Sequence, residues 1–145
     1  VLNCGKKDPV YQRFVTCLMV SFDAVPKLEP PAEKKDTRLF QLRIYESHNV
    51  ERALKKIAMF NEGGEVTLFR EAGMNPVFFG ETLAGTKMPN LTYMITFDDE
   101  AAKKAGWKKF ISGDGWKKLK SDPAYKDTVS NITNLVLTPT PASQL

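Results

Sequence analysis

The sequence predicts an α+β fold: a ferredoxin-like β-α-β-β-α-β unit whose two helices cover one face of a four-stranded antiparallel sheet. The first observation behind this prediction is the apolar spacing, which changes between the period of two typical of strands and the longer period of helices in that order. The second is the composition, because 42% hydrophobic and 26% charged residues in a chain of 145 are typical of one globular domain.

The first strand and the first helix are expected directly after residue 37. Residues 38–46 have the pattern of a strand with one apolar face. Phe40, Leu42 and Ile44 alternate there with Gln41, Arg43 and Tyr45. From Asn49 the spacing is helical, with an apolar stripe of Val50, Leu54, Ile57 and Ala58. Gly63 and Gly64 each cost about 1 kcal/mol in a helix interior, so we expect a helix that is kinked or briefly broken there.

The second half of the unit repeats this change of period. Two β-rich runs come first and suit the strands of a hairpin, because a loop with glycine and proline separates them. The expected elements are strands at 75–83 and 91–97, a helix capped by Asp98 and Asp99 that continues to about Ile111, a helical turn at 115–120, and a fourth strand at 129–137.

The sequence also predicts how the chain is divided. Residues 25–37 contain three prolines among charged side chains. Because proline disfavours helix in the residue before it, this stretch is predicted to be a linker, with a domain boundary near residue 37. The complete domain then comprises residues 38–138, and residues 139–145 form a tail.

An internal repeat accounts for the residues before this linker. Shifting the chain by 114 residues places a DPxYxxxV motif on a second copy of itself. The aligned residues are Lys6, Asp8, Pro9, Tyr11 and Val15 with Lys120, Asp122, Pro123, Tyr125 and Val129. Residues 1–24 are therefore predicted to be the C-terminal strand region of a preceding copy of the domain. The alternative is an N-terminal helix with a coincidental motif.

The two faces of the sheet are expected to differ in role. If Phe40, Leu42 and Ile44 face the helices, the opposite face is mixed polar and aromatic, and a second sheet is expected to cover it. That face collects Arg43, Tyr45, Phe79, Glu81, Thr92, Met94, Asn131 and Thr133 if every strand keeps its period of two. An apolar cavity with a few polar groups is typical of a small-molecule site. The alternatives are a polar network inside a closed interface and a register off by one.

The candidates for catalysis are few. His48 is the single histidine, which excludes multi-histidine metal sites and argues against a Ser-His-Asp triad. With Glu46 or Glu51 as orienting partner it could be a general base; otherwise it is a surface or capping residue. No glycine-rich phosphate motif occurs, so neither a metal nor a cofactor is predicted. The catalytic candidates are Arg43, Tyr45, His48, Glu81 and Asn131, and the ligand-binding candidates are Phe79, Thr92, Met94 and Thr133.

The positive charge has one notable location. Gly-Trp-Lys-Lys occurs at 106–109 and again at 115–118 and contributes much of a net charge of +4. Tryptophan beside lysine could bind lipid headgroups or a nucleic-acid backbone. A charge of this size is modest for nucleic-acid binding, so we expect the aromatic rings to pack on the sheet, the lysines to face solvent, and no nucleic-acid partner. No run is long enough for a transmembrane segment.

Four segments in order resemble the NIPSNAP family. They are RLFQLRIYESHN, MFNEGGEVTLFREAGMNPVFFGETLAG, MPNLTYMITFDD and DPAYKDTVSNITNLVL, which together span most of residues 38–138. The resemblance implies a unit of the dimeric α+β barrel superfamily, often present in tandem copies, and here the C-terminal part of a tandem member. Relatives in that superfamily include cofactor-independent monooxygenases and isomerases. The family has no agreed set of catalytic residues, so the resemblance implies the fold and no activity.

Two hypotheses about function follow. The first is a NIPSNAP-like barrel without assigned activity that binds a small apolar ligand or a protein partner, either as a homo-oligomer or by pairing of tandem domains. The second is a cofactor-independent monooxygenase or isomerase that acts on a hydrophobic molecule in the barrel pocket. A wide pocket with a buried ionisable group favours the enzyme. An interface filled by side chains argues against it. The sequence predicts no compartment.

Overall fold

The computed structural model describes residue 11 and residues 13–145. In this part of the chain the elements are β1 (Leu18–Ser21), β2 (Leu39–Glu46), α1 (Val50–Asn61), α2 (Glu65–Glu71), β3 (Asn75–Ala84), β4 (Asn90–Phe97), α3 (Glu100–Ser112), α4 (Asp114–Ser121), a 3-10 turn at Pro123–Tyr125, and β5 (Asn131–Leu137). Of the predicted repeat, Lys6, Asp8 and Pro9 lie outside the described residues.

The strands form one antiparallel sheet in the order β1-β3-β4-β2-β5. Strands β5, β2, β4 and β3 have the order of a ferredoxin-like unit, so the predicted α+β fold is confirmed. The sheet differs from the prediction in its fifth strand, β1, which pairs with β3 through Val20 opposite Glu81 and Ser21 opposite Gly80. The outer edge of β3 offers unpaired backbone groups, and an extended apolar segment satisfies them.

The predicted break between the first two helices is present. Helix α1 ends at Asn61 and α2 begins at Glu65. Gly64 between them has φ +78°, a left-handed conformation that glycine adopts without the steric cost a Cβ would bring. At the N-terminal ends of α1 and α3, the side chains of Asn49 and Asp99 cap the helices by accepting hydrogen bonds from backbone N–H groups.

The predicted apolar stripe of α1 is wrong at Val50 and Leu54, whereas Ile57 packs against the core. Val50 and Leu54 are 62% and 50% exposed, although they begin the stripe Val50, Leu54, Ile57 and Ala58. The buried residues of α1 are Ala53, Lys56, Met59 and Phe60. Successive residues of a helix are about 100° apart, so a shift of one or two positions moves the buried face. The sequence reading failed because the buried stripe contains a lysine.

The expected orientation of the sheet is also wrong. Gln41, Arg43 and Tyr45 face the helices, since Trp107 of α3 donates to Gln41 and the Tyr45 ring packs near Phe60 of α1. Phe40, Leu42 and Ile44 lie on the opposite face. Alternation fixes which residues share a face but cannot tell which face the helices cover. Both faces of β2 are partly apolar, so composition did not decide it.

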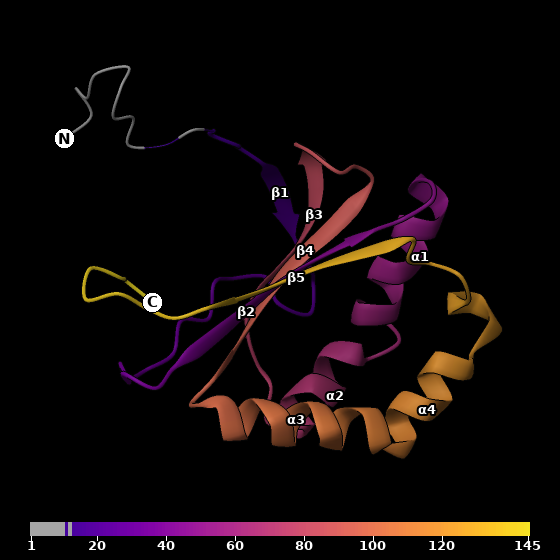
Figure 1. Cartoon of the computed structure of the whole chain (residues 1–145). Coiled ribbons are helices and arrows are strands. Elements are labelled where there is room, and N and C mark those ends of the chain that lie inside the picture. The colour runs from indigo at the N-terminus through magenta and orange to yellow at the C-terminus, as the bar shows by residue number, and fades with distance from the viewer. Residues whose placement is uncertain (1–10, 12) are drawn as a thin grey trace.

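The core lies between the sheet and the helices, which gather on one side of it (Figure 1). Phe60, Phe69, Phe79 and Tyr93 are all at most 1% exposed, and their rings contact one another. Phe22 and Val25, which precede β2 in the chain, join this core. The domain boundaries themselves remain a prediction.

Candidate ligand-binding cleft

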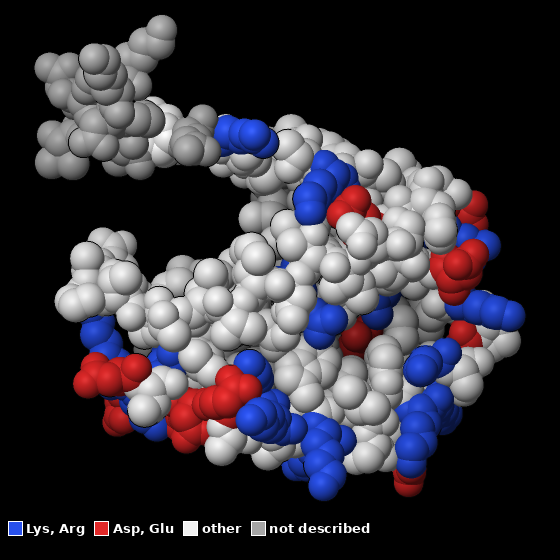
Figure 2. Space-filling view, in the orientation of Figure 1, with Lys and Arg blue, Asp and Glu red and all other residues white. Residues whose placement is uncertain are grey.

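A cleft of about 580 Å³ opens between the helix-facing side of β2 and β5 and the helices α1, α2, α3 and α4. Figure 2 shows a hollow on this side of the molecule with basic and acidic side chains inside it. The cleft is lined by Gln41, Arg43, Tyr45, Lys56, Glu65, Trp107, Phe110, Ile111, Trp116, Lys120, Val129 and Ile132. Most of this wall is aromatic or aliphatic, with a few charged groups, which is the usual composition of a small-molecule site.

Arg43 lies between two aromatic rings of the cleft. Its guanidinium carbon is 4.6 Å from the ring centre of Trp107 and 5.2 Å from that of Tyr45. These are cation–π distances. The Nε atom is buried, and no hydrogen-bond acceptor among the described residues reaches it. The rings therefore hold the guanidinium in place without using its hydrogen-bond donors.

Trp107 is itself fixed by a short chain of hydrogen bonds. Its indole N–H donates to Gln41 at 2.7 Å, and the Gln41 amide donates to Asn134 of β5 at 2.7 Å. This chain connects α3 to the two strands that form the sheet side of the cleft. The Trp107 ring is therefore held both by the Arg43 guanidinium over its face and by the hydrogen bond of its indole N–H.

A buried ion pair lies deeper in the cleft. Lys56 Nζ of α1 is 2.6 Å from Glu65 Oε2 of α2, and the side chains are only 5% and 2% exposed. The Lys56 ammonium also lies 4.5 Å from the centre of the Phe60 ring. Burial raises the pKa of the Glu65 carboxyl, while the Lys56 ammonium works in the opposite direction. The pair joins the two helices across the glycine break.

Two tyrosines continue the wall toward the core. The hydroxyls of Tyr45 and Tyr93 share a hydrogen bond of 2.9 Å. Burial raises the pKa of Tyr45 and raises that of Tyr93 well above its ordinary value. Both phenols are therefore held neutral, and Tyr93 is shielded from solvent behind Tyr45. Of the two, only Tyr45 lines the cleft.

The raised pKa of Tyr93 predicts a loss of stability at high pH. An unfolded phenol ionises near pH 10, whereas folded Tyr93 keeps its proton to a higher pH. The folded state then binds more protons, so the free energy of unfolding falls as the pH rises above about 10. Urea unfolding at pH values of about 8 and about 11 measures this loss. Tyr93→Phe should reduce it, and Phe69→Leu, which disturbs the same core without removing a titrating group, should not. An unchanged loss in Tyr93→Phe contradicts the prediction.

The structure divides the predicted site residues between the two faces of the sheet. Arg43 and Tyr45 line the cleft. Phe79 and Glu81 lie on the same face, but Phe79 is in the core, stacked on Tyr93 at 4.7 Å, and Glu81 is outside the cleft wall. The opposite face holds Thr92, Met94, Asn131 and Thr133. The prediction that all eight residues share one face is therefore wrong, because on β4 and β5 the expected register was off by one.

His48 lies apart from the cleft. Its Nε2 is 3.5 Å from Asp127 Oδ1, and about half of its side chain is exposed. Neither predicted orienting carboxylate pairs with it, since Glu46 accepts from Asn131 and Glu51 pairs with Lys55. The structure therefore places His48 at the surface beside the start of α1.

Sequence reasoning missed the charged pair of the cleft. Lys56 was not recognised in the sequence because it falls on the buried face of α1 between Ala53 and Phe60, where lysine is not expected. Glu65 directly follows the glycine break and reads as an ordinary acidic residue at a helix start. The available signal was the spacing of three and four residues that puts Lys56 on the stripe of Ala53 and Phe60. The packing of Trp107, Phe110 and Trp116 against the core is confirmed, and the neighbouring lysines face solvent.

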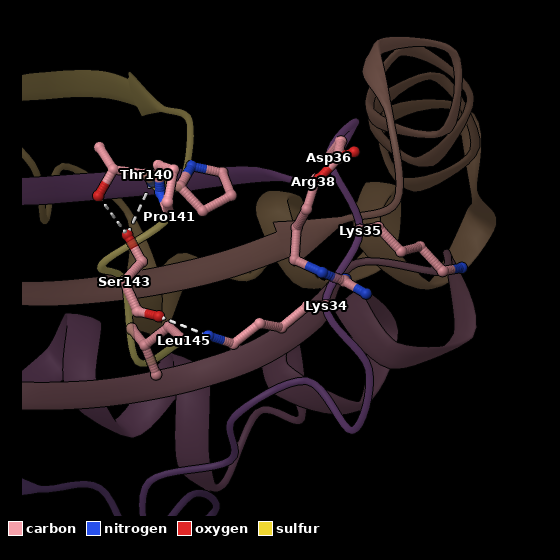
Figure 3. Close-up of a pocket in the computed structure, with 9 residues that line it drawn as sticks. Lys34, Lys35, Asp36, Arg38, Thr140, Pro141, Ser143 and Leu145 are labelled. Atoms are coloured by element: carbon pink, nitrogen blue, oxygen red, sulfur yellow. Dashed lines mark hydrogen bonds between the residues drawn. The ribbon is translucent and has the colours of Figure 1, made fainter.

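A second cavity, of about 330 Å³, lies where residues 34–38 meet the residues after β5 (Figure 3). Only Nε of Arg38, like that of Arg43, is buried without a partner among the described residues. Lys34 donates to the Ser143 carbonyl, and the terminal nitrogens of Arg38 donate to Asp98 and to the Glu33 carbonyl. The cleft beside Arg43 is therefore the better candidate for a ligand site. No helix in the described part of the chain is both long and apolar enough to cross a membrane.

The fold defines the class of protein, which is an α+β protein with a ferredoxin-like sheet covered on one face by helices. The NIPSNAP family profile matches residues 40–144, and the chain belongs to the NIPSNAP family. None of the curated proteins searched matches it.

Three solved structures illustrate the similarity of fold. An uncharacterized NIPSNAP-like domain protein from Burkholderia xenovorans has a TM-score of 0.66 at 14% identity, covering 76% of this chain and 91% of that one. A NIPSNAP family protein from Agrobacterium tumefaciens has a TM-score of 0.64 at 17% identity, with 74% and 98% covered. Another from Agrobacterium tumefaciens, of unknown function, has a TM-score of 0.64 at 15% identity, with 77% and 96% covered. At these identities the similarity concerns the fold alone.

Proposed function

We propose that this NIPSNAP domain binds a small, mainly apolar molecule in the cleft between the sheet and the helices. The observation that carries the proposal is the cleft itself, about 580 Å³ with walls of Trp107, Phe110 and Trp116. Pockets of about 300–1,000 Å³ with such walls suit ligands of drug-like size. The site lies on the Arg43 face of the sheet, which the helices cover, whereas the sequence predicted that the helices cover the opposite face.

The test uses 1-decanol as an apolar probe and the indole N–H signals of Trp107 and Trp116 in NMR spectra as the readout. We expect decanol to shift both signals. Ile132→Trp fills the cleft from β5 and should abolish the shifts, whereas Leu135→Trp, on the opposite face of the same strand, should preserve them. Unshifted indole signals in the wild type would contradict the proposal, and so would shifts in Ile132→Trp equal to those in the wild type.

A second candidate function is proton-transfer chemistry on such a ligand, as in an isomerase that needs no cofactor. The specific observation is Glu65, a cleft-lining carboxyl whose pKa burial raises. A raised pKa suits a general base or acid near neutral pH. The isomerase is tested by the conversion of β,γ-unsaturated ketones to their conjugated isomers, which absorbance measures. The monooxygenase alternative is tested by measuring oxygen uptake with hydroquinones as substrates. No turnover, or equal turnover in Glu65→Gln, rejects the enzyme.

The partner that we propose for the other face of the sheet is a second copy of this domain. Two observations support it. The exposed apolar residues Leu135 and Leu137 lie on that face, 45% and 40% exposed. In addition, β1, whose sequence aligns with β5 in the predicted repeat, pairs with the edge of β3, so this edge accepts a strand of β5 type. A preceding tandem copy would present the same surface as a second chain.

Sedimentation equilibrium tests this partner. We expect a dimer that Leu135→Lys weakens, because a charge would be buried against the opposing sheet. Leu54→Lys, at an exposed position of α1, is the matched control and should remain dimeric. A wild-type protein that is monomeric at every attainable concentration contradicts pairing between chains. A monomer whose longer natural chain contains a second copy would support pairing within one polypeptide.

A further inference from the structure

We propose that Arg43 binds the anionic group of an amphipathic ligand whose apolar part occupies the aromatic wall of the cleft. The anionic group is a carboxylate or a phosphate, the two groups that match the planar fork of a guanidinium. This inference rests on the proposed function, because it assumes that the cleft is the ligand site. It adds the chemical class of the ligand and the residue that selects it.

The first argument is the unused hydrogen-bonding capacity of Arg43. Its Nε is buried without an acceptor among the described residues, and buried polar groups in proteins nearly always have a partner. Its two neighbours at close range, Trp107 and Tyr45, present ring faces to the guanidinium, and ring faces attract the charge without satisfying the directional N–H donors. The terminal guanidinium nitrogens have no acceptor among the described residues either, and they are not buried, so an oxyanion in the cleft would supply acceptors for these groups.

The second argument is the local charge. The cleft wall contains three basic side chains, Arg43, Lys56 and Lys120, against one acidic side chain, Glu65. Lys56 and Glu65 neutralise each other at 2.6 Å. Arg43 and the exposed Lys120 therefore leave a positive excess in an otherwise apolar cavity. Such a site favours an anion, because weak solvent screening strengthens charge interactions there.

The third argument concerns rigidity. The Trp107 ring stacks on the guanidinium, and its indole N–H is held by Gln41, which in turn donates to Asn134. Arg43 itself projects from the middle of β2, which is paired on both sides, with β4 and β5. A guanidinium fixed in this way loses little conformational freedom when a ligand binds, so more of the interaction energy contributes to affinity.

The aromatic wall of the cleft determines the chemical character of the rest of the ligand. Phe110 and Trp116 lie 4.6 Å apart between ring centres and line the same cleft as Ile111 and Ile132. These groups have no donors or acceptors for a polar ligand, apart from the indole N–H of Trp116. The ligand is therefore amphipathic, with one charged end at Arg43 and an apolar body along α3 and α4.

The experiment compares three probes with the same chain: decanoate, decyl phosphate and 1-decanol, titrated below their critical micelle concentrations and followed by the Trp107 and Trp116 indole signals. We expect at least one anionic probe to bind about tenfold more tightly than decanol, since a hydrogen-bonded charge in an apolar site contributes about that factor or more. Arg43→Gln should remove this preference. Arg70→Gln, which removes the same charge from a surface ion pair with Glu29, should retain it.

Each outcome has a defined meaning. If no probe binds, the proposed function fails, and this inference fails with it. If decanol binds as tightly as both anions, the cleft remains an apolar site, and the role of Arg43 is overturned. The same conclusion holds if Arg43→Gln keeps the preference. Should Arg43→Gln fail to fold, Arg43→Lys keeps a charge but not the planar fork, and an unchanged preference in it also counts against the inference. A preference between decanoate and decyl phosphate identifies the anionic group.

Discussion

Replacing Lys56 by methionine is expected to lower the free energy of unfolding by about 3–5 kcal/mol, because it leaves the Glu65 carboxylate buried without a counter-ion. The pair is 2.6 Å apart, and the Glu65 side chain is only 2% exposed, so solvent cannot replace the lost ammonium. Methionine has nearly the volume of the lysine stem, which limits any loss of packing. Urea unfolding at neutral pH measures the effect.

The double variant Lys56→Met with Glu65→Met is the control for this prediction. It removes both charges, and apolar replacement of a buried pair is often neutral or stabilising, so most of the lost stability should return. The double-mutant cycle then separates the charge interaction from packing. A single variant that loses less than about 1 kcal/mol would show that water reaches Glu65 or that its carboxyl takes up a proton.

Phe60→Ala is expected to cost about 3–5 kcal/mol of stability, the usual range for truncating a fully buried phenylalanine. Phe60 has no exposed surface. Its ring contacts those of Phe22, Tyr45, Phe69, Phe79 and Tyr93, with centres 5.4–6.2 Å away. The cavity left by the ring would adjoin Tyr45 and thus the inner wall of the cleft.

Leu54→Ala on the same helix is the matched control. Leu54 is 50% exposed, and substitutions at such positions usually change stability by at most about 0.5 kcal/mol. Chemical denaturation of both variants under the same conditions gives the comparison. Equal losses in the two variants would mean that the buried face of α1 differs from the one described.

The sequence was sufficient for the order of the elements and for most of their bounds. Strand and helix periods are local properties, and glycine and proline mark their ends: β2, the break at Gly63 and Gly64, and the hairpin of β3 and β4 all lie where they were expected. The additional strand β1 was not predicted as part of this sheet. Its pairing with β3 depends on an edge that only the assembled sheet provides.

The sequence was insufficient for the location of the site. Which face of β2 the helices cover depends on how the complete set of side chains packs. In this protein Arg43, and not Leu42, packs against Trp107 on the helix side. Of the predicted site residues, only Arg43 and Tyr45 line the cleft. The Lys56–Glu65 pair depends on two helices that meet at an angle. Local periodicity contains no information about such an angle.

The glycine break between α1 and α2 has a consequence for how the cleft could admit a ligand. A Cβ atom at Gly63 would lie 2.6 Å from the Met59 carbonyl oxygen and 2.9 Å from Leu119 Cδ1 of α4, whereas a Cβ atom at Gly64 would meet no atom within 4 Å. The corner is therefore packed tightly against α4 at Gly63. The back of the cavity is therefore expected to keep its shape whether it is empty or filled, and ligand entry would depend on side-chain rotation at the mouth, at Lys120 and Ile132, without helix movement.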